Sequence, residues 1–186
     1  DLIETAIRIK KKQKLIDSSA NDGPFSVQEI VDCIPEKILL GGADAMAAFE
    51  WAYHLGLTNE TVNPFRKKFT IRQCELHEPV YKLKQFCFGN VGREAKNYEV
   101  GFKRLLYHFS PLVVLLNGDK LKNVRGKVNK RIDGVRNHGV LLVGWHGSYW
   151  ILKNTWGKEW GKDGYLYLNK NSVPNLHEQV YYIPVL

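Results

Sequence analysis

The 186-residue sequence lacks long apolar runs, a nucleic-acid-binding motif and all but three cysteines. No apolar run approaches the roughly 20 residues that a membrane-spanning helix needs, so we expect no membrane partner. Lys and Arg number 27 against 19 Asp and Glu, but the basic runs at 10–14, 66–68 and 120–131 lack interleaved aromatics and a recognisable module. A solvated basic surface therefore accounts for the formal charge of +8, and we expect no nucleic-acid partner.

The small, odd number of cysteines leaves two possibilities for disulfide bonding. Cysteine occurs only at Cys33, Cys74 and Cys87, so one thiol is spare or has a partner outside this sequence. The triplet Asn59-Glu60-Thr61 is an acceptor sequon for N-glycosylation. It hints at the secretory route, although such triplets also arise by chance. Asn59 is therefore a candidate glycosylation site.

The sequence divides into two halves with different secondary-structure signals. Residues 1–58 have helical periodicity, and Ser26 to Glu29 form a capping box in which hydroxyl and carboxylate satisfy free N–H groups of the first turn. A further helix is predicted over 41–56. The later residues predict a helix over 98–109 and strands over 80–89, 111–118, 139–145, 148–156, 164–169 and 180–186. Helices followed by antiparallel strands indicate an α+β fold, with two subdomains and a cleft between them.

Two polar side chains stand out in the second half. His138 lies at the start of one apolar run, and Asn154 follows the next run, immediately before Thr155-Trp156-Gly157. A histidine on a strand is usually an ordinary surface or core residue, and we interpret the histidines at 54, 77, 108, 146 and 177 in that way. The density of Trp-Gly pairs after Asn154 exceeds what a β core needs. This density indicates a functional site around His138 and Asn154.

The stretch from Asn137 to Leu168 closely resembles the papain-like cysteine peptidases, the cathepsin family. NHGVLLVGW and YWILKNTWGKEWGKDGY match the family's His and Asn signatures almost letter for letter. FSVQEIVDC, Gly41-Gly42, GLTNETVNPF and the C-terminal YYIPVL resemble further family segments. The resemblance implies a papain-like two-subdomain fold with the active-site cleft between the halves. The helical subdomain would cover 1–88, incomplete at its N-terminus, and an antiparallel β-barrel subdomain 89–186, its last strand returning to the helical half.

The resemblance also implies a role for each matching residue. His138 would take the proton of a thiol and remain as a stabilising cation. Asn154 would fix the tautomer and orientation of that imidazole, and Trp156 would shield their hydrogen bond from water. Cys33 would bond to Cys74, leaving Cys87 free. No metal and no cofactor are implied.

Substrate-binding residues follow from the same resemblance. Asn137 would offer backbone groups, and Gly42 would pair with the peptide as a short strand. The correspondence gives Gly41, Gly42, Asn137, Ala43, Asp44, Leu115 and Arg136, with Val180 behind them. We predict that Asp44 and Arg136 pair across the groove, since an apolar side chain entering there would desolvate both charges.

The nucleophile is the missing part of this pattern. In papain-like enzymes the His lies roughly 130–150 residues after the Cys, and only 137 residues precede His138. In the family the Cys segment leads into a helix that Leu2-Ile3-Glu4 resembles here. By that register the implied Cys, and the Gln that completes the oxyanion hole, would lie upstream of Asp1, and we expect the chain alone to be inactive. Cys87 lies 51 residues before His138, on a strand that the resemblance places away from the cleft.

Two functions remain open. The first is a papain-like cysteine endopeptidase whose N-terminal segment is supplied separately, with a peptide or protein substrate, or a protein inhibitor, in its cleft. The second is a non-catalytic relative that binds peptides or inhibitors without cutting, which the lack of a family cysteine near Leu39 favours. Either function implies a secreted or a lysosomal or vacuolar protein.

Overall fold

The computed structural model describes residues 1–34, 45–66, 73–89, 98–109, 111–173, 176 and 181–185. The chain divides into two compact units. Unit 1 comprises Asp1, Ile3–Cys87 and Pro184–Leu186, and unit 2 comprises Leu2 and Phe88–Ile183. In the part of the chain that the structure describes, no helix is long and apolar enough to span a membrane.

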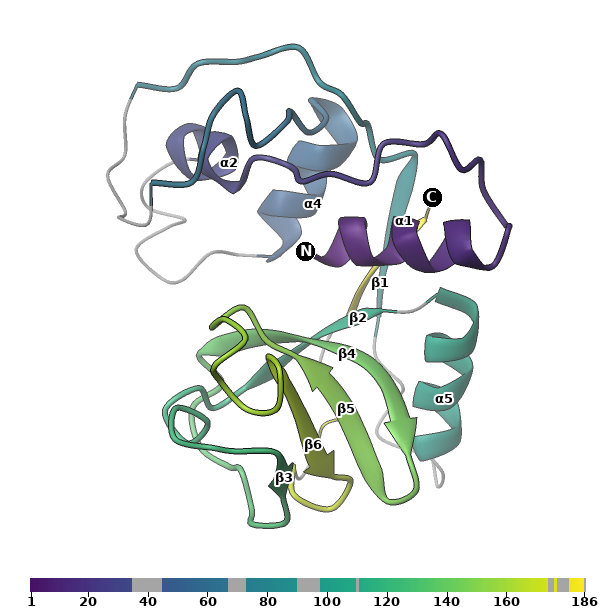
Figure 1. Cartoon of the computed structure of the whole chain (residues 1–186), viewed down its shortest axis with the longest axis vertical. Helices are drawn as coiled ribbons and strands as arrows, with labels where there is room; N and C mark the ends of the chain where they lie inside the picture. Colours follow the sequence, from purple (N-terminus) through teal and green to yellow (C-terminus); the bar gives the residue numbers. More distant parts are fainter. Residues whose placement is uncertain are drawn as a thin grey trace. The chain divides into compact units, whose positions relative to one another are not determined.

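Helices account for most of the regular structure in unit 1 (Figure 1). α1 (Leu2–Lys12) buries Leu2, Ala6 and Ile7 on one side, as the apolar spacing predicts. Its last turn holds three lysines, where positive charge is favoured by the helix dipole. α4 (Ala45–His54) lies within the helix predicted over 41–56; residues 41–44 of that prediction lie outside the described residues.

The predicted capping box of α2 (Val27–Cys33) forms only in part. The Ser26 hydroxyl accepts a hydrogen bond from the Glu29 N–H at 3.1 Å, as predicted. The carboxylate half of the prediction is wrong, because the Ser26 N–H donates to the Thr58 carbonyl instead. The buried Glu29 carboxylate accepts from the backbone N–H of His77 at 2.9 Å and lies 3.2 Å from its ring Nδ1. Glu29 therefore joins α2 to a distant loop rather than capping its own helix.

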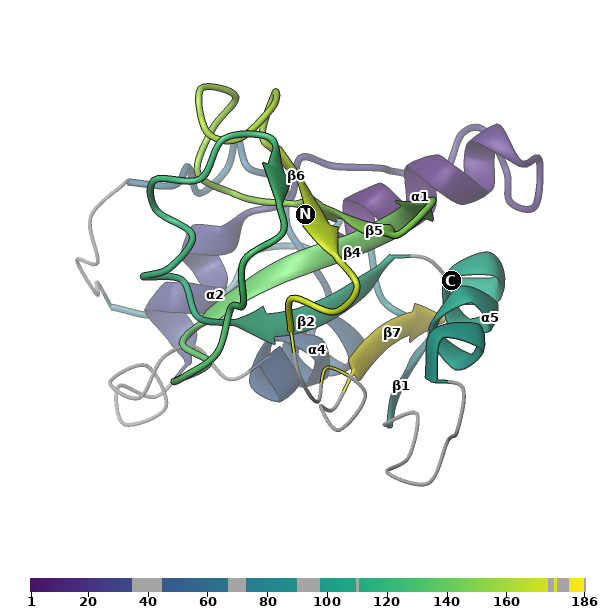
Figure 2. The same cartoon turned by 90° about the horizontal axis from the view of Figure 1, so that it is seen from below.

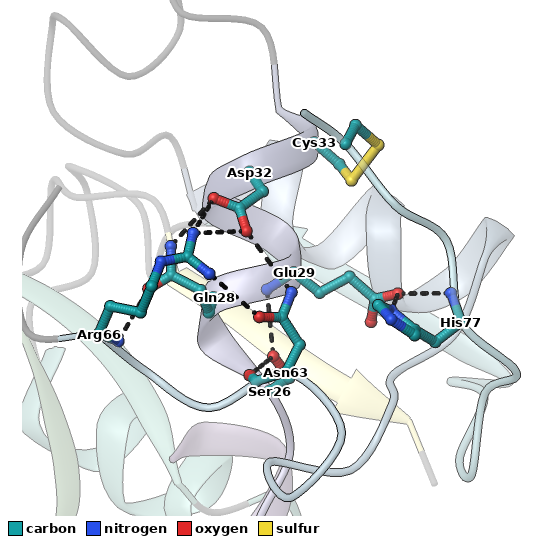
Figure 3. The surroundings of a disulfide bond; sticks show 9 residues. Ser26, Gln28, Glu29, Asp32, Cys33, Asn63, Arg66 and His77 are labelled. Atoms are coloured by element: carbon teal, nitrogen blue, oxygen red, sulfur yellow. Dashed lines mark hydrogen bonds and ion pairs between the residues drawn. A yellow bond between two sulfur atoms is a disulfide. The ribbon is translucent and has the colours of Figure 1, made fainter. Parts of the chain in front are cut away.

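A disulfide and an ion pair of the buried Asp32 lie at the two sides of the same helix (Figure 3). Cys33 is bonded to Cys74, with the two Cα atoms 4.6 Å apart, which confirms the pairing that the resemblance implied. Asp32, whose side chain is 4% exposed, accepts hydrogen bonds from Arg66 and from Gln28. A buried carboxylate is tolerated only when it is paired and hydrogen-bonded, and Asp32 satisfies that condition.

Unit 2 is built on a five-stranded sheet in the order β2-β4-β5-β6-β3. The predicted strands form as β2 (Leu112–Leu116), β4 (His138–His146), β5 (Tyr149–Lys153) and β6 (Tyr165–Asn169). Neighbours among these four pair antiparallel. The sequence did not predict β3 (Lys127–Val128), a two-residue strand that pairs parallel with β6 at the edge of the sheet. A separate two-stranded sheet consists of β1 (Gln85–Gly89) and β7 (Tyr181–Val185).

The core of unit 2 lies between this sheet and α5 (Tyr98–Phe109), which runs beside it in both cartoon views (Figures 1 and 2). Phe102 of α5 meets the fully buried Trp150 of β5 in a T-shaped contact, with ring centroids 5.5 Å apart. Leu142 and Leu152 are buried beside them from the paired strands β4 and β5. This core fixes the strands that carry His138 and precede Asn154.

Candidate active site

Strand pairing brings His138 and Asn154 together. β4 begins at His138 and β5 ends at Lys153, and the two strands run antiparallel with Leu141 opposite Lys153. The imidazole Nε2 of His138 lies 2.8 Å from the side-chain Oδ1 of Asn154. Asn154 is buried and His138 is half-buried. The two residues that the sequence analysis paired are therefore hydrogen-bonded neighbours.

The contacts of Asn154 determine the tautomer of His138. The backbone N–H of Thr155 donates to Asn154 Oδ1 at 2.8 Å, so that atom is the amide oxygen and not the nitrogen. Since a carbonyl oxygen can only accept, His138 Nε2 must carry the proton. In the neutral ring Nδ1 then has a free lone pair, and no side chain of the described residues is bonded to it. Sequence reasoning missed the role of the Thr155 N–H, which has no side-chain signal.

Trp156 covers one face of the imidazole. Its ring stacks on His138 with centroids 4.4 Å apart and an interplanar angle of 25°. Trp160 meets Trp156 edge-on at 5.4 Å, and its indole N–H donates to the carbonyl of Leu121 at 3.0 Å. The Trp156 indole that stacks on His138 is thus supported by Trp160, whose own ring is hydrogen-bonded to the backbone.

Two glycines allow close approaches around the pair. A Cβ on Gly118 would lie 2.7 Å from the Cβ of His138, closer than two such carbons can pack. Gly161 has φ +66°, and a Cβ there would lie 2.3 Å from the carbonyl oxygen of Tyr165. One of the glycines in the Trp-Gly pairs after Asn154 is therefore required by a turn that only glycine fits. The NG pair after β2 was a possible sequence signal for the approach at Gly118.

Asn137 joins the start of β4 to the loop after β2. Its side-chain oxygen accepts from the Gly118 N–H at 2.9 Å, and its amide donates to Asp119 at 3.1 Å. Hydrogen bonds from Lys122 and then Asn137 lower the pKa of the exposed Asp119 carboxyl below its usual value. The backbone position before His138 is therefore fixed by its own side chain.

The other predicted binding residues are only partly described. Leu115 and Arg136 both line a pocket of about 110 Å³ in unit 2, together with Asp133 and Gly134. Gly41, Gly42, Ala43, Asp44 and Val180 lie outside the described residues. The pairing of Asp44 with Arg136 therefore stays a prediction.

Cys87 lies on β1 as an exposed free thiol, whereas Cys33 and Cys74 are consumed in the disulfide. Among the residues that the structure describes, no three His, Cys, Asp or Glu side chains gather in a way that could hold a metal ion.

Comparison with known proteins places this geometry in a family. The profile described as "Papain family cysteine protease" matches residues 3–183. The chain belongs to the papain family of cysteine proteases. It is 32% identical to a viral cathepsin of Orgyia pseudotsugata multicapsid polyhedrosis virus, covering 79% of this chain and 46% of that protein. It is 27% identical to human cathepsin O, covering 80% of this chain and 48% of the other. The chain thus spans about half the length of these curated relatives.

Solved structures of the papain family share the fold. Procathepsin L2 from Tenebrio molitor larval midgut superposes with a TM-score of 0.76 at 22% identity, covering 98% of this chain and 60% of the other. A Carica candamarcensis cysteine protease, solved in complex with E-64, superposes with a TM-score of 0.73 at 21% identity, covering 94% and 82%. These likenesses confirm the predicted α+β, papain-like fold class.

Proposed function

We propose that this chain provides the general base of a papain-type cysteine endopeptidase. The observation that carries the proposal is the 2.8 Å contact between His138 Nε2 and Asn154 Oδ1 beneath the stacked Trp156. With Nε2 protonated, Nδ1 takes the proton of a thiol and makes a thiolate, the species that attacks a peptide carbonyl. The resulting imidazolium keeps Asn154 as acceptor, and Trp156 excludes water from one side of the ring.

The nucleophile and the oxyanion donor have no assigned residue in this sequence. Two of the three cysteines form the disulfide, and no imidazole of the described residues contacts the thiol of Cys87. We therefore expect the isolated chain to bind without cutting, and the thiol to come from a residue outside it. The partner would be a peptide or protein substrate, or a protein inhibitor.

The test compares two proteins. One is the 186-residue chain, and the other, the longer protein, is the same chain expressed with any residues that its reading frame encodes before Asp1. Turnover of a fluorogenic dipeptidyl substrate and labelling by a thiol-directed epoxide should occur in the longer protein alone. In that protein His138→Ala should lower kcat by about 10²–10⁴-fold. Asn154→Ala removes one hydrogen bond to a charged ring, worth about 1.5–3 kcal/mol, or roughly ten- to a hundredfold in rate.

His146→Ala is the matched control, because His146 is exposed at the other end of β4. It should leave turnover unchanged. Labelling of Cys87 with turnover by the isolated chain would overturn the assignment. An inactive longer protein that still binds peptides would instead support the alternative, a non-catalytic papain-fold protein.

A secreted or a lysosomal or vacuolar location is part of the same proposal. The disulfide supports it, since such bonds persist in oxidising compartments, and so does the sequon. Asn59 is half-buried in a surface turn, where its Oδ1 accepts from both the N–H and the hydroxyl of Thr61 at 2.9 and 2.8 Å. Expressed in a eukaryotic secretory cell, the chain should carry an endoglycosidase-sensitive glycan that Thr61→Ala removes and Thr61→Ser keeps. Secretion without any glycan would remove Asn59 from the proposal.

A further inference from the structure

The net charge of the protein lies entirely in unit 2. Residues 88–183 contain 15 Lys and Arg against 7 Asp and Glu, whereas the rest of the chain contains 12 of each. Between residues 100 and 158 there are 11 basic side chains and only two acidic ones, Asp119 and Asp133. Apart from Arg136, a predicted substrate-binding residue, the proposed peptidase site makes no use of this excess.

Seven of these basic residues fall within 119–136, the segment that runs from β2 past the edge strand β3 toward β4 (Figure 1). Four apolar residues of the segment are buried in the core of unit 2, namely Leu121, Val124, Val128 and Ile132. The basic residues between and beside these anchors are exposed, namely Lys122, Arg125, Lys127, Lys130 and Arg131. The exposed basic residues thus alternate along the chain with buried anchors, and this segment is here called the 119–136 ridge.

The two acidic residues neutralise only part of the ridge. Asp119 pairs with Lys122 at 2.7 Å, and Asp133 pairs with Lys120 and with Arg131. In each acid the hydrogen bond from lysine lowers the pKa of the carboxyl, so both remain charged near neutral pH.

Three cations on the ridge have no acidic partner among the described residues. Within the described residues, no carboxylate pairs with Arg125, Lys127 or Lys130. Lys127 lies over the ring of Tyr149, 5.3 Å from its centroid. A cluster of exposed cations without acidic partners attracts polyanions.

We propose that the 119–136 ridge binds a sulfated polysaccharide. A sulfated chain offers an anion to each of several separate cations, and the exposed Asn123 and Asn129 lie between these residues in the sequence as amide donors. Single-stranded nucleic acid fits less well, because single strands are held by bases stacked on aromatic rings. The segment contains no Phe, Tyr or Trp, and Lys127 lies over the adjacent Tyr149. The disulfide also favours an oxidising compartment, where glycans are the available polyanions.

The probe is heparin, on a column and in a binding titration at several salt concentrations. The variant Arg125→Gln with Lys130→Gln removes two unpaired cations. It should elute at clearly lower NaCl, and the slope of log affinity against log salt should fall by about two, one for each lost contact. Lys12→Gln with Lys14→Gln is the matched control, because both lysines are exposed in unit 1 and the change in net charge is equal. This control should elute close to the parent chain.

Two results would overturn the proposal. If the ridge variant and the control shift equally, net charge and not the ridge governs retention. If single-stranded or duplex DNA at matched charge density is bound more tightly than heparin, and the ridge variant loses that binding, the partner is nucleic acid instead. Epoxide labelling of the longer protein is independent of both results, so the peptidase proposal stands or falls separately.

Discussion

The two units are stabilised in different ways. Unit 2 has one apolar cluster, in which Phe102, Leu142 and Trp150 are fully buried between the sheet and α5. The described part of unit 1 buries polar groups beside its apolar ones, namely Ser26, Gln28, Glu29, Asp32 and Thr58. Apolar burial is non-directional and tolerates small shifts, whereas buried polar groups stabilise only while each is hydrogen-bonded. Among the described residues, unit 1 therefore depends more on individual hydrogen bonds than unit 2, whose buried polar residues are Asn154, Lys170 and Ser172.

The largest expected effect is in the core of unit 2. Leu142 is fully buried in β4 between β2 and β5, so Leu142→Ala loses its apolar contacts and leaves a cavity. We expect a loss of about 2–5 kcal/mol in the free energy of unfolding, measured by urea denaturation. Leu115→Ala, on the neighbouring β2 but 41% exposed, is the matched control and should cost far less. Equal losses would mean that this sheet is not the core on which unit 2 depends.

The next effect tests the disulfide of unit 1. Cys33→Ser with Cys74→Ser opens a loop of 41 residues, which the chain-entropy account values at about 4 kcal/mol. Hydrogen exchange should show lost protection in α2, while β4 and β5 keep theirs, because units with separate cores open separately. Cys87→Ser, which changes the exposed free thiol, should do neither. Equal loss of protection in both units would contradict the distinction drawn between them.

The sequence predicted unit 2 well because its signals are local. The alternation and apolar runs that predict β2, β4, β5 and β6 are read within a few residues, and the sheet buries them as expected. β3 was missed because two residues inside a basic segment carry no periodicity. Leu121 and Val124, which precede β3, and Val128 within it are buried in the core of unit 2, and only the tertiary structure shows this.

Long-range polar contacts were the part that could not be predicted. Glu29 matches a capping box, but its carboxylate bonds to His77, 48 residues away, because the Ser26 N–H is already taken by Thr58. The pairing of His138 with Asn154 was predicted only because the surrounding motif is family-specific. Neither residue type alone would have identified it.

A smaller effect tests the half of the capping box that does form. Ser26 is buried, and its hydroxyl accepts from the Glu29 N–H and donates to the Asn63 carbonyl at 2.6 Å. Ser26→Ala should cost about 1 kcal/mol of unfolding free energy, within the usual range of about 0.5–2 for an N-cap. Ser18→Ala, at an exposed position in the same unit, should cost nearly nothing in the same urea titration. An unchanged midpoint for Ser26→Ala would show that water replaces the cap.

The smallest effect concerns an ion pair of unit 2 and its dependence on pH. Glu99 accepts from Lys103 and from the buried Lys170, both at 2.6 Å, and these bonds, Lys103 first, lower the pKa of its carboxyl below 4.5. A carboxyl with a lowered pKa in the folded state adds stability above its unfolded pKa. That stability is lost as the pH falls through the folded value. The gain is small because solvent screens a partly exposed pair.

Glu99→Gln should therefore reduce stability at neutral pH and flatten its decline below about pH 4.5, the usual value of this carboxyl. Thermal unfolding at several pH values measures both changes. Glu159→Gln is the control, because Glu159 is exposed and has no ion pair among the described residues. It should leave the slope as it is in the parent chain. If the Glu99→Gln variant keeps the full loss of stability at acid pH, other carboxylates cause that loss. The contact between Glu99 of α5 and Lys170 would then join the two elements without an electrostatic contribution to stability.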